Sequence, residues 1–351
     1  MPAPNAADNI LAFVLQTRWN NIPIMIVPHF FKQSAISQRI LRGSLALLLA
    51  AVCGGSTHAG SVLAFGNYGD QNLADGPREG NPLIPGLFAD PSLAKFGDTY
   101  YIYSTTDGFG WETGRWVVWK SKDFVHWSFS GESFPEITGK KNWAPGHPIF
   151  RDGKYWFPFT CHGDHNYLAV GDTPEGPFHF ANHGAPISGS IDAELFVDDD
   201  GTPYLLSGNV RPEIRKLKPD LSGVESKVCT LDYHKGYVEG GFLFKRNGIY
   251  YAAAANNGYA EYRIIYAMSD KLEGPWRYPT NNIIIEPNPA DHLWGTGHGN
   301  ILKIPGTDEW ILIYLRSRMG ECVDPFRDGN VYRQVCAERI GFNSDGAIKQ
   351  V

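Results

Sequence analysis

The chain has 351 residues, with 39 glycines, 24 prolines and 13% aromatic residues. This composition, with little heptad-like periodicity, favours many short strands joined by tight turns over a helical architecture. The formal net charge is −6, and removal of the first 59 residues takes away four basic residues and one acidic residue, which brings it to −9. Such a surface repels nucleic acid, so we expect no nucleic-acid partner and a neutral ligand with apolar faces, such as a sugar.

The first 59 residues have the features of an export signal rather than of a folded segment. Arg39 and Arg42 precede the apolar run 45–52, which is too short to span a bilayer, and the small residues that follow end at Ala59. We expect cleavage after Ala59 and a periplasmic or secreted protein, with no membrane association in the mature form.

Two other interpretations of this stretch stay open. Cys53 is a candidate lipoprotein cysteine, although the bulky Val52 before it disfavours that interpretation. Met25 is a candidate for the true start of the protein, and in that case the first stretch has no structural meaning.

Four cysteines follow the predicted cleavage point. In an exported chain they can form up to two disulfides with three possible pairings, and only Cys322 with Cys336 is close enough in sequence to propose. Buried thiols fit the sequence equally well.

Five aromatic segments recur along the chain and predict repeated structural units. A period of this length, with a second strand and a turn after each aromatic strand, indicates the blades of a β-propeller rather than helical repeats. We therefore predict an all-β, five-bladed β-propeller over 81–351, with the aromatic strand first in each blade. An N-terminal extension with the signal peptide (1–59) and a polar entry segment (60–80) precede it. The segments are DTYYIYS from Asp98, GKYWFPF from Gly153, GTPYLLS from Gly201, GIYYAAA from Gly248 and DEWILIY from Asp308, with starts 55, 48, 47 and 60 residues apart.

Three carboxylates occupy the same phase of this repeat. Asp90 in GLFADPSL, Asp192 in SIDAELFV and Glu239 in YVEGGFLF each precede an aromatic strand by eight or nine residues. Because equivalent positions of propeller blades meet at one mouth of the central channel, we expect the three acids to converge. Glycoside hydrolysis needs one carboxylic acid to protonate the leaving oxygen and a second carboxylate as base or nucleophile. A third carboxylate nearby can keep the pKa of the acid in its working range.

Each acid also has a simpler structural interpretation. Asp90 before Pro91 can open a turn, and Asp192 can bond backbone groups at a strand start. Glu239, next to two glycines, can mark a β-bulge. The shared repeat phase favours the catalytic interpretation for all three.

Aromatic residues in nearby loops are candidate platforms for a sugar ring, since its C–H face suits an aromatic surface. Trp143 in NWAPGHP belongs to the second repeat, and Phe109, Trp111 and Trp294 lie in glycine-rich loop segments. In the fifth repeat the equivalent stretch is GTGHGN, where His298 is either a satisfied buried histidine or a ligand of a water or metal ion.

Together these motifs resemble glycoside hydrolase family 43, the five-bladed β-propeller β-xylosidases, α-L-arabinofuranosidases and arabinanases. The resemblance covers about residues 81–351 and rests on NPLIPGLFADPS, NWAP, GSIDAELFVDDDG, YVEGGFLFKRNGIYY and GHGN. It implies an inverting mechanism with Asp90 as general base, Glu239 as general acid, and Asp192 as the residue that tunes the pKa of the acid and orients it. It also implies substrate binding by Arg316 after the fifth aromatic strand. No cofactor is required, and a structural calcium is possible through water on His298.

The chain departs from the family pattern beside these positions. Gly146 stands where an acid is usual, Ala193 where a proline is usual, and Gly241 where proline or alanine is usual. We expect an exported, exo-acting, inverting glycosidase that removes β-xylosyl or α-L-arabinofuranosyl residues from plant cell-wall oligosaccharides. The alternative, which the departures motivate, is a non-catalytic carbohydrate-binding propeller. The sequence makes no prediction of the oligomeric state.

Overall fold

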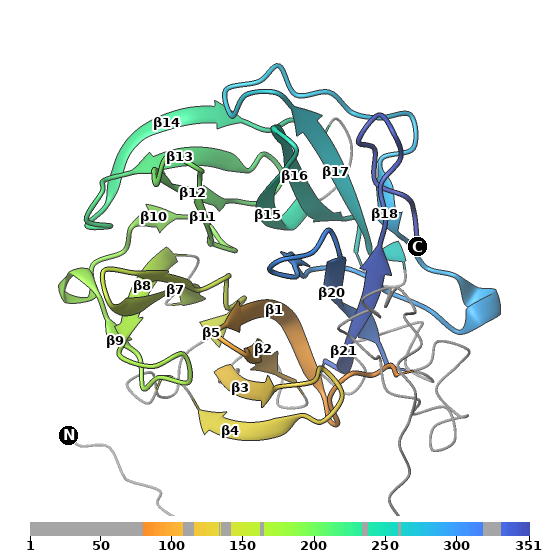
Figure 1. The fold of residues 1–351 in the computed structure, drawn as a ribbon, viewed down its shortest axis with the longest axis horizontal. Helices are drawn as coiled ribbons and strands as arrows, with labels where there is room; N and C mark the ends of the chain where they lie inside the picture. The colour runs from red at the N-terminus through yellow and green to blue at the C-terminus, as the bar shows by residue number, and fades with distance from the viewer. Residues whose placement is uncertain are drawn as a thin grey trace, which may run out of the picture. The chain divides into compact units, whose positions relative to one another are not determined.

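The computed structural model describes residues 80–107, 116–132, 134, 142–161, 165–233, 238–258, 261–318 and 331–351. The strands of these residues form five antiparallel sheets around a common centre (Figure 1). The expected all-β, five-bladed β-propeller is therefore confirmed. The described ranges also hold two short 3₁₀ helices, η2 (Asn182–Gly184) and η4 (Pro289–Asp291), and no helix in them is long and apolar enough to cross a membrane.

The five sheets follow one another along the chain, one per blade. Blade one contains β1 (Phe88–Phe96), β2 (Thr99–Thr106), β3 (Trp116–Ser121) and β4 (Ser128–Glu132). Blade two contains β5 (Asn142–Trp143), β6 (Ile149–Arg151), β7 (Lys154–Cys161), β8 (His165–Gly171), β9 (His179–Phe180) and β10 (Ser188–Gly189). Blade three contains β11 (Glu194–Val197), β12 (Pro203–Ser207), β13 (Glu213–Leu217) and β14 (Val224–Thr230). Blade four contains β15 (Val238–Arg246), β16 (Ile249–Asn256), β17 (Arg263–Ser269) and β18 (Ile283–Ile285), and blade five contains β19 (Ile301–Lys303), β20 (Trp310–Ser317) and β21 (Arg333–Ile340).

The aromatic segment forms the second strand of each blade, and the expectation that it comes first was wrong. β2, β7, β12, β16 and β20 pair with a strand on each side, whereas β1, β11, β15 and β19 stand at one end of their sheets. Figure 1 shows β1, β11 and β15 next to the centre. A strand with neighbours on both sides is well enclosed in its sheet, and many aromatic side chains of these strands are buried, such as Tyr103, Phe157 and Tyr251. The three predicted acids therefore lie at the start of innermost strands.

Aromatic side chains fill the space between neighbouring blades. Tyr103 of β2 and Phe157 of β7 are fully buried, and their ring centroids lie 5.2 Å apart. Phe244 of β15 and Trp310 of β20 make the same kind of contact at 5.3 Å. Large rings bury much apolar area each, so a few of them join two blades.

The first described residues close the ring beside the last strand. Leu83 N donates to Val335 O at 2.8 Å, and the side chain of Asn81 bonds both the N–H and the C=O of Ala337, at 2.9 and 3.2 Å. This segment follows the outer edge of β21, so residues from the two ends of the propeller complete blade five together.

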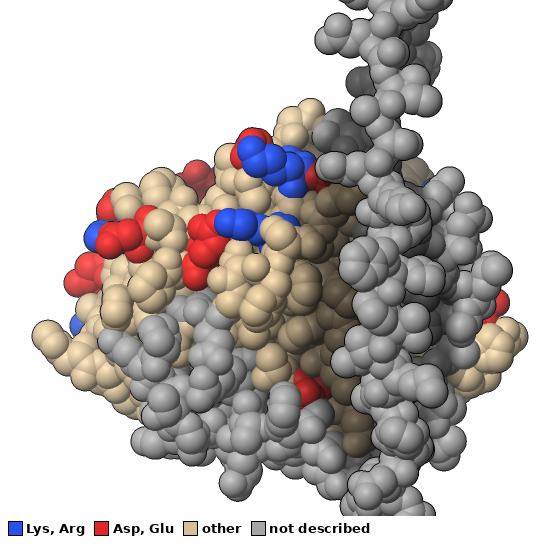
Figure 2. Space-filling view, turned by 90° about the horizontal axis from the view of Figure 1, so that it is seen from below, with Lys and Arg blue, Asp and Glu red and all other residues tan. Residues whose placement is uncertain are grey.

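Charged side chains at the surface form pairs of opposite sign. On the face shown in Figure 2, Lys and Arg side chains lie next to Asp and Glu side chains. Lys245 bonds Asp198 at 2.8 Å and Arg246 bonds Asp308 at 2.6 Å, which links blade four to blades three and five. Ion pairs that remain in contact with solvent contribute about 0–1 kcal/mol each, so the apolar contacts between blades dominate stability.

A second set of links crosses the central channel. Asn300 of blade five bonds the N–H and C=O of Leu93 in blade one at 2.8 and 3.0 Å. His147 of blade two lies with Nδ1 3.1 Å from the same carbonyl, and its N–H donates to Glu194 Oε2 of blade three at 2.6 Å. These polar contacts tie four blades at one level of the channel. Burial raises the pKa of Glu194 to about 8, because the charged form has left water.

Replacement of Glu194 by Gln tests this buried acid. The pKa of Glu194 is about 8 in the folded chain and 4.5 in its ordinary state. Between these values the unfolded chain has lost a proton that the folded chain keeps, so stability falls as pH rises through this window and levels off above it. Glu194→Gln removes this dependence, which amounts to at most about 1.4 kcal/mol per pH unit.

The measurement is the free energy of unfolding in denaturant at several values from pH 5 to pH 8. The exposed Glu273, changed to Gln, serves as the matched control and leaves the slope as in the wild type. A Glu194→Gln slope identical to that of the wild type would contradict the assignment.

Candidate active site

One backbone conformation recurs where the innermost strand of each blade begins. The residue at this place has a positive φ in all five blades: Asp90 (48°), Ala144 (41°), Asp192 (59°), Gly240 (56°) and His298 (29°). Non-glycine residues adopt this region rarely, and such positions cluster at functional sites. In β1 and β15 it coincides with a shift in strand register, that is, a β-bulge. The repeat thus gives five equivalent positions at one mouth of the channel.

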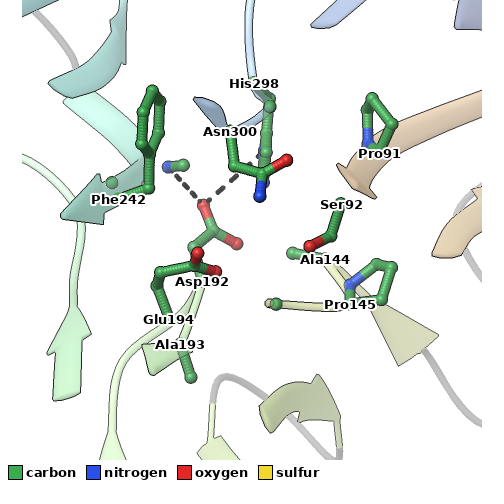
Figure 3. A pocket seen from close by; sticks show the side chains of 14 residues that line it. Pro91, Ser92, Ala144, Pro145, Asp192, Ala193, Glu194, Phe242, His298 and Asn300 are labelled. Atoms are coloured by element: carbon green, nitrogen blue, oxygen red, sulfur yellow. Dashed lines mark hydrogen bonds and ion pairs between the residues drawn. The ribbon is translucent and has the colours of Figure 1, made fainter. Parts of the chain in front are cut away.

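His298 lies between two of the predicted acids. Its Nδ1 is 3.3 Å from Asp90 Oδ1. The same nitrogen is 4.0 Å from Asp192 Oδ2, a contact that Figure 3 draws as a dashed line. Asp90 and Asp192 are 7% and 6% exposed, so these carboxylates depend on the protein for their partners. The structure therefore brings blades one, three and five together at this point.

Asp192 also contacts the segment that carries the third acid. Its Oδ2 accepts from Gly240 N at 2.8 Å, and its own N–H donates to Thr160 Oγ1 at 2.8 Å. Gly240 directly follows Glu239, so this bond fixes the peptide unit next to that carboxyl. A side chain at 240 would meet the ring of His298 at 2.7 Å, which explains the glycine.

Glu239 is half-buried and is held by a tyrosine. Tyr262 Oη donates to Glu239 Oε1 at 2.6 Å. Burial, followed by the charge of Glu239, raises the pKa of Tyr262 well above its usual range, so the phenol keeps its proton and stays a donor. Sequence reasoning missed Tyr262, which lies in the loop between β16 and β17.

A small cavity with several polar lining residues borders Asp192 (Figure 3). Its volume is about 10 Å³, and Ser92, Asp192, Glu194 and Asn300 are among the residues that line it. Ser92 Oγ is buried and has no hydrogen-bond partner within the described part of the chain. A cavity of this size and polarity suits one water molecule.

The structure explains the most conspicuous departure from the family pattern. A Cβ at Gly146 would lie 1.9 Å from Ala193 O, so no acid can stand there while this backbone is kept. The carboxyl that bonds the next N–H, that of His147, comes from Glu194 in the neighbouring blade. Sequence reasoning missed Glu194, although it stands two residues after the positive-φ position, as Ser92 and Asn300 do in their blades.

An arginine that the sequence analysis did not select contacts the predicted base. Arg333 Nη1 donates to Asp90 Oδ1 at 3.1 Å, and the rest of its guanidinium bonds Asp107. Burial disfavours its charge, but the carboxylates of Asp107 and Asp90 outweigh burial and raise the pKa of Arg333. The predicted Arg316 is buried in β20 and donates to Gln334 Oε1. Its role in substrate binding stays a prediction.

Of the four aromatic residues predicted to stack on a sugar, the structure describes the side chain of Trp294 alone. Phe109 and Trp111 lie outside the described residues. The backbone of Trp143 pairs with Thr160 in β7, and its side chain is not described. Trp294 is half-buried, with its ring 5.7 Å from that of His292. Stacking by these residues stays a prediction.

The described residues do not make a protein-only metal site. Among them, no group of three or more His, Cys, Asp or Glu side chains has an arrangement that could hold a metal ion. The predicted calcium, reached through water on His298, stays a prediction, and no step below depends on it. Cys336 is buried in β21, and Cys322 lies outside the described residues, so the proposed pairing of the two stays a prediction.

The chain is similar to known proteins over most of the described propeller. The model of glycosyl hydrolases family 43 matches residues 79–348. The chain is 28% identical over 299 residues to the β-D-galactofuranosidase xynD of Aspergillus niger, with 78% of this chain and 85% of that protein covered. It is 30% identical over 277 residues to the β-xylosidase of Bacillus subtilis, with 68% of this chain covered, and it spans about half of that relative, 49%.

A solved structure described as a glycoside hydrolase has the same fold. It is 37% identical to this chain, with a TM-score of 0.68, and the match covers 77% of this chain and 63% of that one. The family match extends over nearly all of the described propeller and includes all three acids. The chain therefore belongs to family 43 of the glycosyl hydrolases.

Proposed function

We propose that this chain is an exported, inverting glycosidase that removes β-xylosyl or α-L-arabinofuranosyl residues from plant cell-wall oligosaccharides. The observation that carries the proposal is the approach of acids from separate blades, with His298 between Asp90 and Asp192 and with Asp192 bonded next to Glu239. Names of relatives support the sugars, since they include β-xylosidases and arabinoxylan arabinofuranohydrolases. Export rests on the predicted signal peptide in 1–59.

In this mechanism Asp90 is the base. An ionised Asp90 accepts a proton from a water molecule as that water attacks the anomeric carbon, and the glycosidic bond breaks on the opposite face. Arg333 places a positive charge beside Asp90 and engages Oδ1, which orients the carboxylate. The sugar leaves with inverted configuration because only one displacement occurs.

Glu239 is the acid in the same step. It donates its proton to the glycosidic oxygen as the bond breaks, so the leaving group departs as an alcohol. Tyr262 bonds Oε1 and fixes the orientation of the carboxyl, and Asp192 fixes the following peptide unit. In this proposal Asp192 also keeps the role of tuning the acid that the family resemblance implies.

A panel of aryl glycosides tests the activity. We expect release of p-nitrophenol from the β-D-xyloside or the α-L-arabinofuranoside, and of pentose from xylan or arabinan oligosaccharides. The β-D-galactofuranoside belongs in the panel because of the similarity to the Aspergillus niger enzyme. Activity on the β-D-galactofuranoside alone would show that the protein is a glycosidase, but that its substrate is not one of the proposed sugars. Oligosaccharide binding without any hydrolysis would instead favour the non-catalytic propeller.

The dependence on the leaving group separates the two roles. Glu239→Ala is expected to lower kcat on oligosaccharides by about 10²–10⁴-fold and on p-nitrophenyl glycosides far less, since p-nitrophenolate leaves without a proton. Asp90→Asn removes the base, which every substrate needs, and lowers kcat on both by similar factors. Equal losses on both substrates for Glu239→Ala would assign that residue another role.

A further inference from the structure

Arg333 stands between two buried carboxylates. It is the first residue of β21, and its guanidinium bonds Asp90 through one nitrogen, Nη1, at 3.1 Å. The opposite edge of the guanidinium bonds Asp107, with Nε at 2.9 Å from Oδ2 and Nη2 at 3.0 Å from Oδ1. The two-bond contact is therefore with Asp107, and Asp90 receives a single contact.

Both the backbone and the side chain of Asp107 form hydrogen bonds that hold it beside Arg333. It directly follows β2, is 6% exposed, and accepts a third bond from Arg333 N at 3.0 Å. Its own N–H donates to Leu87 O at 2.9 Å, three residues before Asp90. Asp107 thus contacts both the arginine and the segment that leads to the predicted base.

Arg333 bonds two carboxylates at once, and this limits how many of its N–H groups can bond Asp90. Arginine binds a lone carboxylate preferentially by two parallel N–H···O bonds, which engage both oxygens. If Arg333 turned to Asp90 in that way, both oxygens would already accept a hydrogen bond from the cation, and each would have only its second lone pair left to accept a proton from water. Because Asp107 occupies the Nε and Nη2 edge, the contact of Arg333 with Asp90 is limited to Oδ1.

We propose that Asp107 is a positioning residue for the hydrolytic step: it holds Arg333 so that the guanidinium orients Asp90 through one oxygen and leaves the carboxylate able to act as a base. The inference rests on the proposed function, in which Asp90 is the general base. If Asp107 only balanced the buried charge of Arg333, its replacement would reduce the amount of folded protein and leave the kcat of the folded molecules unchanged.

The test is a double-mutant cycle on kcat with Asp107→Asn, Arg333→Gln and the double variant. Asp107→Asn keeps the shape of the side chain and removes its charge, and it is expected to lower kcat by about 10–100-fold through misplacement of Asp90. KM and the calorimetric stoichiometry of product sugar binding stay near wild-type values, because the fold and the sugar pocket remain. The double variant is no slower than Arg333→Gln alone, because Asp107 acts through Arg333.

Asp308→Asn is the matched control. Asp308 also takes two bonds from one arginine, Arg246, at 3.2 and 2.6 Å, but it lies in the turn before β20, at the end of the blades away from the acids. We expect this variant to keep the wild-type kcat. If Asp107→Asn fails to fold, Asp107→Glu keeps the charge, and it should lower kcat by a smaller factor with unchanged stoichiometry.

Three results would overturn the inference while the wild type is active. They are a kcat of Asp107→Asn within twofold of the wild type, a loss that matches a fall in binding stoichiometry, and fully additive effects in the double variant. A wild type that hydrolyses no glycoside would overturn the proposed function, and this inference with it.

Discussion

The site depends on one backbone constraint that the propeller repeats five times. Each innermost strand begins at a residue with a positive φ, which turns the chain at the mouth of the channel. Because the blades are arranged around one centre (Figure 1), positions about 50 residues apart along the chain come together at this mouth. Blades one, three and five place Asp90, Asp192 and His298 there, while alanine and glycine at the other two positions leave room.

The three acidic side chains of the candidate site need specific partners, because they are largely buried. A carboxylate removed from water is costly unless hydrogen bonds or opposite charges replace its hydration. Here each acid has a different partner: Arg333 for Asp90, the N–H of Gly240 for Asp192, and the phenol of Tyr262 for Glu239. These differences in environment allow three carboxylates of similar chemistry to perform different tasks.

The sequence was sufficient to predict the fold and the approach of Asp90 to Asp192, because the strands and these two positions repeat with the blades. Glu239 stands one residue before the equivalent position, Gly240, and the catalytic roles of the three acids stay a proposal. Sequence reasoning placed the aromatic strands first, since these carry the clearest repeated pattern, whereas the innermost strands vary from three residues in β19 to nine in β1 and β15. It missed Tyr262, directly before β17, and Arg333, the first residue of β21, because no recurring residue type marks the start of the third strand of the blades. Glu194 was missed because its role depends on a contact between blades. It bonds the N–H of His147, which follows Gly146, and the carbonyl of Ala193 leaves no room for a side chain at Gly146. Such contacts depend on packing between blades, which no local pattern encodes.

The stereochemistry of the first product tests the central claim most directly, namely that Asp90 acts on a water molecule while Glu239 protonates the leaving group. Proton NMR during the first minutes of hydrolysis, before mutarotation, identifies the anomer released. The account predicts the anomer opposite to that of the bond cleaved, such as α-xylose from a β-xyloside. Release of the same anomer would show a covalent intermediate and two displacements, and it would contradict the roles given to the acids.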